Sequence, residues 1–232
     1  MNKLFFLILL LAISSQLLAQ ETGTTVNYKI GVSGGFGLIF PGDLKEINTE
    51  VINSSQFDLS VVNNFPPRPV YGGYILNSFG KRIAFGPSYF YFSTGSRLGI
   101  KDYSGSYAFD QIVSAHSLGI QFEFLLDERE KSNWYLEFTG GINLATWSIK
   151  EKLTIDGEKE SDLTKLKATR PFIYPGVKYI YPLTKMLNFT VRAGVSVDLA
   201  GKYSFEGNPD YETDSKASFT GPRILVGLEY GY

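Results

Sequence analysis

The sequence contains no cysteine, a single histidine and only 19% charged residues among its 232 positions. Without cysteine the chain can form neither disulfides nor thiolate metal sites, and it cannot carry the lipidated N-terminal cysteine of a lipoprotein. The 22 basic and 23 acidic residues nearly cancel, and no segment shows the Lys/Arg excess that binding to nucleic acid requires. We therefore expect no disulfide framework and no nucleic-acid partner.

A long apolar run occurs only at the N-terminus. Met1–Lys3 is a short basic start, Leu4–Ile13 is apolar, and the small Ala19 follows. This order predicts a secretory signal cleaved after Ala19, so that residues 1–19 are a signal peptide and 20–232 the mature domain. About ten apolar residues fall short of the roughly 20 that cross a bilayer as a helix. The mature chain is thus expected either to be soluble outside the cytoplasm or to enter a membrane by strands.

Aromatic residues and glycine are plentiful, with 18 Phe, 15 Tyr and 24 Gly, which favours strands and tight turns. Five segments alternate apolar with polar or small side chains at period two: Asn27–Phe40, Ile112–Leu126, Trp134–Leu144, Leu187–Leu199 and Ile224–Tyr232. Three more are strand-like but alternate poorly: Pro69–Asn77, Arg82–Thr94 and Arg170–Tyr181. The sequence predicts eight strands, and in the first two of the poorly alternating segments the face of each residue is left open.

The connections between these strands alternate in length. The long ones are Pro41–Arg68, Gly95–Asp110, Lys150–Thr169 and Gly201–Ser218, and the short ones are Asn77–Lys81, Asp127–Ser132 and Pro182–Met186. In the first long loop Asp43 can cap a helical turn through Val51. Short periplasmic turns, long outer loops and an even strand count are typical of bacterial outer-membrane barrels. We predict an all-β fold, an eight-stranded antiparallel up-and-down transmembrane β-barrel with short periplasmic turns and long extracellular loops.

The polar faces of the strands indicate which side is the lumen. Charged residues there lie among many glycines, which suits a narrow interior: Lys29, Glu123, Glu137, Arg192, Asp198, Arg223 and Glu229. Aromatic residues gather at strand ends, where membrane interfaces place them: Tyr28, Phe40, Trp134, Tyr179, Tyr181, Tyr230 and Tyr232. The alternative is a soluble lipocalin-like ligand-binding barrel, whose apolar face would point inward.

The signal peptide, the eight-strand rhythm and the ending Gly227–Tyr232 resemble the small outer-membrane β-barrel proteins of Gram-negative bacteria, the OmpA/OmpX-like and PorT-like group. Gly227, Tyr230 and Tyr232 form a Gly-x-x-aromatic-x-aromatic ending that is similar to the assembly signal read by the barrel-insertion machinery, with Tyr in place of the more common final Phe. The resemblance implies location in the cell outer membrane, contact with outer-membrane lipid and lipopolysaccharide, and, for PorT-like members, an accessory role with an envelope or secretion protein partner.

The strongest candidate for catalysis is the pair Ser114 and His116, which lie two residues apart on one strand face. The pair resembles the lipid-facing residues of barrels that deacylate lipid A. Here, however, the order is Ser-Ala-His, and the next strand faces the pair with Thr146 and Ser148 rather than a carboxylate. We therefore expect a non-enzymatic protein.

Two further patterns lack the residues their chemistry needs. Gly31–Gly37 looks like a phosphate loop but has no Lys-Ser/Thr and no following helix. Acidic residues in the third and fourth long loops do not have the spacing of a calcium loop: Asp156, Glu158, Glu160, Asp162, Asp210, Glu212 and Asp214. We expect no metal and no cofactor.

The remaining prediction concerns the lumen, which eight strands leave just wide enough for side chains to fill. Six charged residues lie within about two to six residues of the short turns or termini, hence at similar depth: Lys29, Glu123, Glu137, Lys178, Arg192 and Glu229. Charges held in so narrow a space must be paired. We predict a neutral ring of ion pairs that closes the periplasmic half of the barrel, leaving a structural or surface-interaction role to the long loops.

Overall fold

The computed structural model describes residues 27–40, 43–55, 58–80, 82–103, 105–129, 132–156, 158–199, 202–213 and 218–231. The predicted signal peptide and Tyr232 lie outside these ranges. Within them, no helix is long and apolar enough to cross a membrane.

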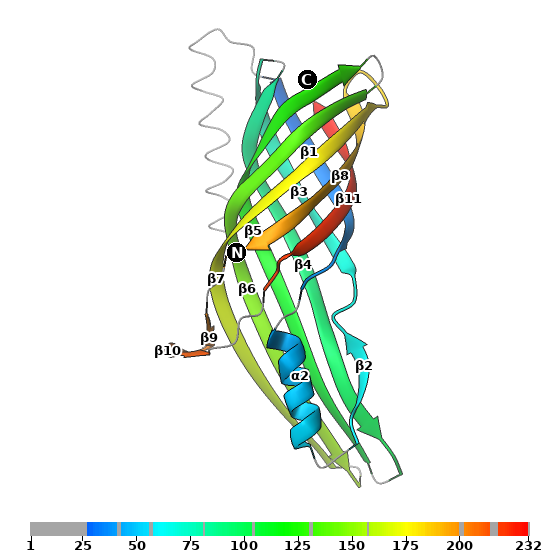
Figure 1. Cartoon of the computed structure of the whole chain (residues 1–232), viewed down its shortest axis with the longest axis vertical. Coiled ribbons are helices and arrows are strands. Elements are labelled where there is room, and N and C mark those ends of the chain that lie inside the picture. The colour runs from blue at the N-terminus through cyan, green and yellow to red at the C-terminus, as the bar shows by residue number, and fades with distance from the viewer. Residues whose placement is uncertain are drawn as a thin grey trace.

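Eight long antiparallel strands form a closed ring, drawn side-on in Figure 1. In ring order they are β1 (Asn27–Gly37), β3 (Arg68–Phe79), β4 (Ile83–Lys101), β5 (Gly105–Arg129), β6 (Ser132–Ile155), β7 (Glu158–Pro182), β8 (Leu187–Asp198) and β11 (Gly221–Gly231). The ring closes because β1 pairs with β3 on one side and with β11 on the other. The predicted eight-stranded up-and-down barrel is confirmed.

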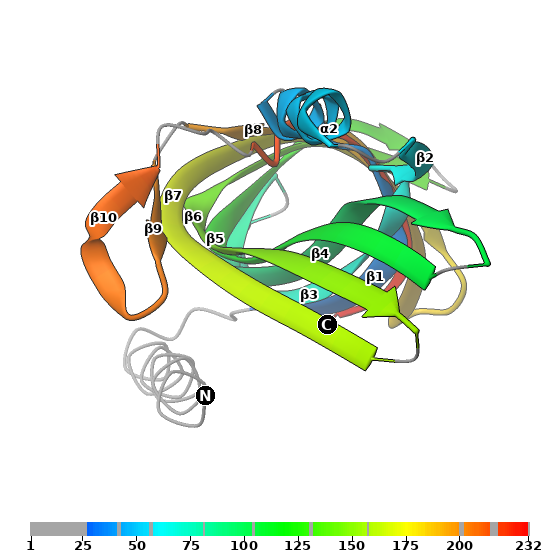
Figure 2. The ribbon, with the colours of Figure 1, turned by 90° about the horizontal axis from the view of Figure 1, so that it is seen from below.

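The other elements lie in the long connections, in the lower half of Figure 1. The first connection holds α2 (Asp43–Ser54), a full helix where the sequence predicted a helical turn, and β2 (Ser60–Asn64), which pairs with β4. The last holds the hairpin β9 (Tyr203–Phe205) and β10 (Asn208–Thr213), which the sequence did not indicate. Figure 2, seen from this end, shows α2 at the side of the opening where β8 lies.

The prediction of a long loop is wrong for two segments. Gly95–Asp110 and Lys150–Thr169 are not loops but continuations of β4 with β5 and of β6 with β7, paired to the tips of their hairpins. The alternation persists there but inverts: in the barrel the outward positions are apolar, whereas beyond it the apolar side chains, such as Leu98, Phe109 and Trp147, are buried on the inner face. The outward face there meets water instead of lipid, so its side chains become polar.

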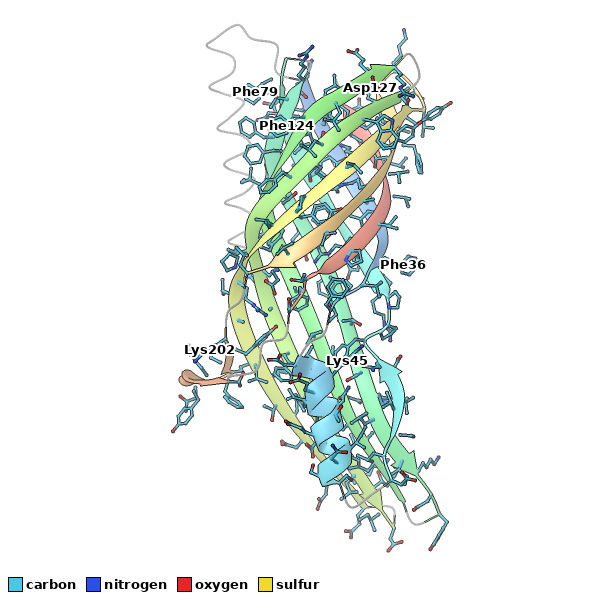
Figure 3. The ribbon with its side chains drawn as sticks, viewed as in Figure 1. Phe36, Lys45, Phe79, Phe124, Asp127 and Lys202 are labelled. Carbon is cyan, nitrogen blue, oxygen red and sulfur yellow. The ribbon has the colours of Figure 1, made fainter. Side chains whose placement is uncertain are left out.

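The outer wall of the barrel is an apolar belt. Its side chains point away from the ring and are 37–63% exposed, as Figure 3 shows for Phe36, Phe79 and Phe124; others include Val32, Ile120, Phe138, Val177, Phe189, Val226 and Leu228. Trp134 and Tyr179 pack with ring centroids 4.9 Å apart at the short-turn end, in the predicted aromatic girdle. An apolar outer wall around a charged interior is the arrangement of an outer-membrane β-barrel.

Candidate functional site

The barrel interior holds a dense set of buried polar side chains, and its layer nearest the short turns is ionic. Lys178 is fully buried and bridges two carboxylates, with Nζ 2.5 Å from Glu123 Oε1 and in contact with Glu229 Oε2. Lys29 approaches the other oxygen of Glu123 at 3.5 Å and lies over the ring of Tyr135. One acidic side chain from β5 and one from β11 are thus held by a lysine on β7 between them.

Arg192 forms the second half of this layer. Its Nε donates to Glu137 Oε2 at 2.8 Å, and a second nitrogen contacts Glu137 Oε1, so the pair is bidentate. Arg192 Nη2 also donates to Gln121 Oε1 at 3.0 Å, and Gln121 Nε2 donates to Glu123 Oε1 at 2.9 Å. Gln121 therefore joins the Arg192 pair to the Lys178 cluster, and the structure brings all six residues of the predicted ring into one network.

Tyr74 is the central member that the sequence analysis missed. Its ring lies 4.6 Å from Lys178 Nζ and 5.1 Å from Arg192 Cζ, and its hydroxyl donates to Glu229 at 2.9 Å. The ring reaches this place only because Gly31 has no side chain: a Cβ there would lie 2.1 Å from Tyr74 Cζ. Gly31–Gly37 is thus part of β1, and its first glycine makes room for an aromatic ring rather than for a phosphate.

A second ion pair lies farther from the short turns, toward the long connections. Arg170 Nη1 is 3.3 Å from Asp198 Oδ2, and both side chains are buried. Asp198 also accepts from Asn143 at 3.3 Å and from the backbone N–H of Phe219 at 3.1 Å, which ties the end of the last connection to the barrel. Asp198 and Arg223 were recognised as lumen residues from the sequence, whereas Arg170, at the start of a poorly alternating segment, was not.

The outer half of the lumen is closed by an apolar layer, defined here as the buried cluster of Ile39, Leu44, Phe65, Val70, Phe90, Phe92, Val113, Ala115, Ala145, Trp147, Leu166, Tyr203, Phe219 and Leu225. Leu44 of α2 enters it, and Gln111 fastens the helix by donating to Leu44 O at 3.3 Å and Asn48 Oδ1 at 2.7 Å. Only charged residues were assigned to the lumen from the sequence, whereas the structure shows an apolar layer in its outer half. Phe90 and Phe92 point inward, while Tyr89 and Tyr91 point outward. Aromatic side chains therefore occupy both faces of Arg82–Thr94, and its sequence does not alternate between apolar and polar residues.

Two small spaces lie along the lumen in the described part of the chain. A vestibule of about 140 Å³ opens beside Lys29 and Glu229 at the short-turn end. Between the ionic network and the apolar layer, a cavity of about 10 Å³ lies beside Arg192, Tyr174 and Arg223. That volume holds about one water molecule, so side chains rather than solvent occupy this level of the barrel.

Ser114 and His116 both lie on the outer wall, where the contacts of the imidazole are with tyrosines of β4. The Nδ1 atom of His116 is hydrogen-bonded to the hydroxyl of Tyr89 at 2.8 Å, and the imidazole packs against Tyr91 with ring centroids 4.9 Å apart. The strand register sets Thr146 opposite Ser114 and Leu144 opposite His116, so the next strand provides no carboxylate to orient the imidazole.

The described residues include no group of three or more His, Cys, Asp or Glu that could hold a metal ion. Of the acidic residues considered for calcium, Glu158, Glu160 and Asp162 alternate along β7 instead of converging from a loop. The side chains of Asp210 and Asp214 fall outside the described part of the chain.

The predicted assembly signal lies on β11 at the short-turn end. Tyr230 points outward, is 44% exposed, and pairs with Ile30 on β1 and Leu187 on β8. Gly227 faces inward against β1, where a Cβ would lie 2.3 Å from Val32 O. Tyr232 is beyond the described residues.

No protein-family model and no curated protein matches the sequence. Solved structures do resemble the fold. A major outer membrane protein from Thermus thermophilus is 10% identical with a TM-score of 0.47, covering 90% of this chain and 100% of that one. OprG from Pseudomonas aeruginosa is 13% identical with a TM-score of 0.44 (88% and 95%), and Ail, the attachment invasion locus protein of Yersinia pestis, is 11% identical with a TM-score of 0.36 (90% and 100%). The fold assignment rests on the closed ring and its apolar belt.

Proposed function

We propose that this protein is a non-enzymatic outer-membrane barrel that is closed to ions and carries a surface-interaction role on its extracellular part. The observation that supports a closed barrel is the buried ionic network, in which Lys178 and Arg192 each satisfy carboxylates of other strands. An ion would have to displace paired charges at one level and apolar side chains at the next. Both displacements are costly, because each leaves a buried charge unpaired or an ion desolvated.

A recording in planar lipid bilayers tests the closed state. The wild-type protein is expected to show little or no steady conductance, because the two layers fill the lumen in series. Heat-modifiable migration in detergent gels checks that the recorded protein is a folded barrel. A large ohmic pore formed by the folded wild-type protein would contradict the proposal.

Assembly offers a second prediction, which rests on the proposal that the barrel-insertion machinery reads the C-terminal strand. Changing Tyr230 and Tyr232 together to Asp is expected to abolish insertion, because carboxylates at the interface oppose membrane transfer and remove the aromatic signal. Surface levels of the double variant in intact cells provide the measurement. Changing both residues to Phe is the matched control and should preserve insertion. Normal surface levels of the Asp variant would refute the assignment of both tyrosines to the lipid-facing side of the last strand.

A further inference from the structure

The part of β4–β7 that projects beyond the barrel has sharply segregated charges. Its outward positions carry seven basic residues and one acidic one: Arg97, Lys101, Lys150, Lys152, Lys159, Lys165, Lys167 and Asp110. Its inward positions, within the described residues, carry acidic side chains and no basic one: Glu151, Glu158, Glu160 and Asp162. We call the outward side the basic face.

Burial fixes which side each residue takes. Leu166 is 2% exposed inside the sheet, so its neighbours Lys165 and Lys167 point outward. Trp147 is likewise 2% exposed on the inside, which sets Lys150 and Lys152 on the outward side of β6. The cross-strand register places Arg97 opposite Asp110 and Asp110 opposite Lys150, so the single carboxylate of the basic face lies between two cations.

The basic face continues the lipid-facing wall without a break, because both use the same strand positions. On β7 the outward residues run from Val177 and Ile173 through Thr169 to Lys167 and Lys165. On β6 they run from Leu144 through Thr146 and Ser148 to Lys150 and Lys152. Apolar, hydroxyl and cationic side chains thus follow one another outward, which is the order of acyl chain, sugar and phosphate in a phosphorylated glycolipid.

A groove of about 380 Å³ lies at this transition. Leu144 and His116 line its membrane side, and Thr146, Thr169 and Lys167 line its outer side. Ser204 of β9 and Lys202, just before that strand, form a further wall. Two lysines therefore meet at the level where an apolar wall ends.

Most of the cations on the basic face lack an acidic partner within the described part of the chain. No ion pair within 4 Å there involves Lys101, Lys150, Lys152, Lys159 or Lys165. The two groove lysines have exposed partners on the β9–β10 hairpin: Lys167 is 2.5 Å from Glu206, whose carboxyl pKa it lowers, and Lys202 is 3.5 Å from Glu212. Exposed pairs of this kind are weak and exchange readily with a stronger anion.

We propose that the basic face and its groove bind the phosphorylated headgroup of a glycolipid in the surrounding outer leaflet, with the acyl chains against Leu144 and the phosphates on Lys167, Lys202 and the basic-face lysines nearer the hairpin tips. The inference rests on the proposed surface-interaction role and names its partner. A soluble polyanion would match the cations but would leave unexplained why the groove has an apolar membrane side.

The test measures binding of fluorescent bis-phosphorylated lipid A to the folded protein in zwitterionic detergent micelles, by anisotropy. Changing Lys152, Lys165 and Lys167 to Gln should weaken binding on the order of a hundredfold at low salt, since one lysine near an anionic surface is worth roughly fivefold. Changing Glu206 and Glu212 to Gln should strengthen binding. Dephosphorylated lipid A should bind weakly to every variant, and added salt should reduce the differences.

The matched control removes the same charge from the opposite end of the barrel, by changing Arg82, Arg129 and Lys185 to Gln. This variant should bind lipid A as the wild type does. Equal affinity of the wild type and the Lys152/Lys165/Lys167 variant would overturn the proposal, as would binding of heparin fragments without binding of lipid A. The lipid-binding test and the conductance test are independent. Absence of lipid binding would not contradict the closed lumen, and an open wild-type pore would not contradict lipid binding.

Discussion

Changing Lys178 to Met is expected to lower the free energy of unfolding by about 3–5 kcal/mol, the cost of breaking a buried ion pair from one side. Lys178 is fully buried and holds both Glu123 and Glu229. Without the ammonium, two carboxylates share a dry site with Tyr74 and with the more distant Lys29. Urea unfolding from lipid vesicles, followed by tryptophan fluorescence, measures the loss.

Two companion variants show whether charge is the cause. The triple variant Lys178→Met, Glu123→Gln, Glu229→Gln removes the unpaired charges with the lysine and should recover most of the lost stability. Lys185→Met, in the exposed turn before β8, is the control and should change stability by no more than about 0.5 kcal/mol. A Lys178→Met protein as stable as its parent would show that the network does not hold the barrel together.

The ionic network could be anticipated because narrow barrels impose a simple rule. Inward positions are fixed by period two, and depth is fixed by distance from the short turns, so Glu123, Glu137 and Arg192 could be placed at one level from the sequence alone. Tyr74 could not, because its strand carries apolar residues on both faces. Its role depends on Gly31, which is far away in sequence but lies directly opposite Tyr74 on the neighbouring strand β1.

The extracellular hairpins escaped prediction for a different reason. Along β6 the apolar side chains change from the outward positions, such as Leu144, to the inward positions, such as Trp147. A search for one continuous apolar–polar alternation therefore ends where the strand leaves the membrane. The Lys150-Glu151-Lys152 run then looks like a charged loop. In the structure this run belongs to a strand whose outward side is cationic. The inner side of the same strand packs near α2, where Trp147 and Leu44 share the apolar layer. The interruption of the pattern therefore marks the end of the apolar belt rather than the end of the strand.

Phe92 provides the second large effect, and its neighbour on the same strand provides the control. Phe92 is 1% exposed in the apolar layer, edge-on to Phe219, whereas Tyr91 faces outward beside Tyr71 and His116. Phe92→Ala should cost about 3–5 kcal/mol, as for a large core side chain. Tyr91→Ala should cost about 0.5–1.5 kcal/mol, the size of an aromatic contact on a surface. Equal losses in urea unfolding would contradict the inward and outward assignment of β4.

Conductance separates the two layers. Phe92→Ala alone should stay closed, because the ionic network still fills the lumen on the short-turn side. The double variant Arg192→Gln, Glu137→Gln removes both charges of this ion pair, so neither is left unpaired. It should stay closed, because the apolar layer still blocks the lumen. Only the combination of all three changes is expected to admit ions, since it weakens both layers at once. If Phe92→Ala conducted as well as the combined variant, the apolar layer alone would be the barrier, and the buried charges would serve stability instead of closure.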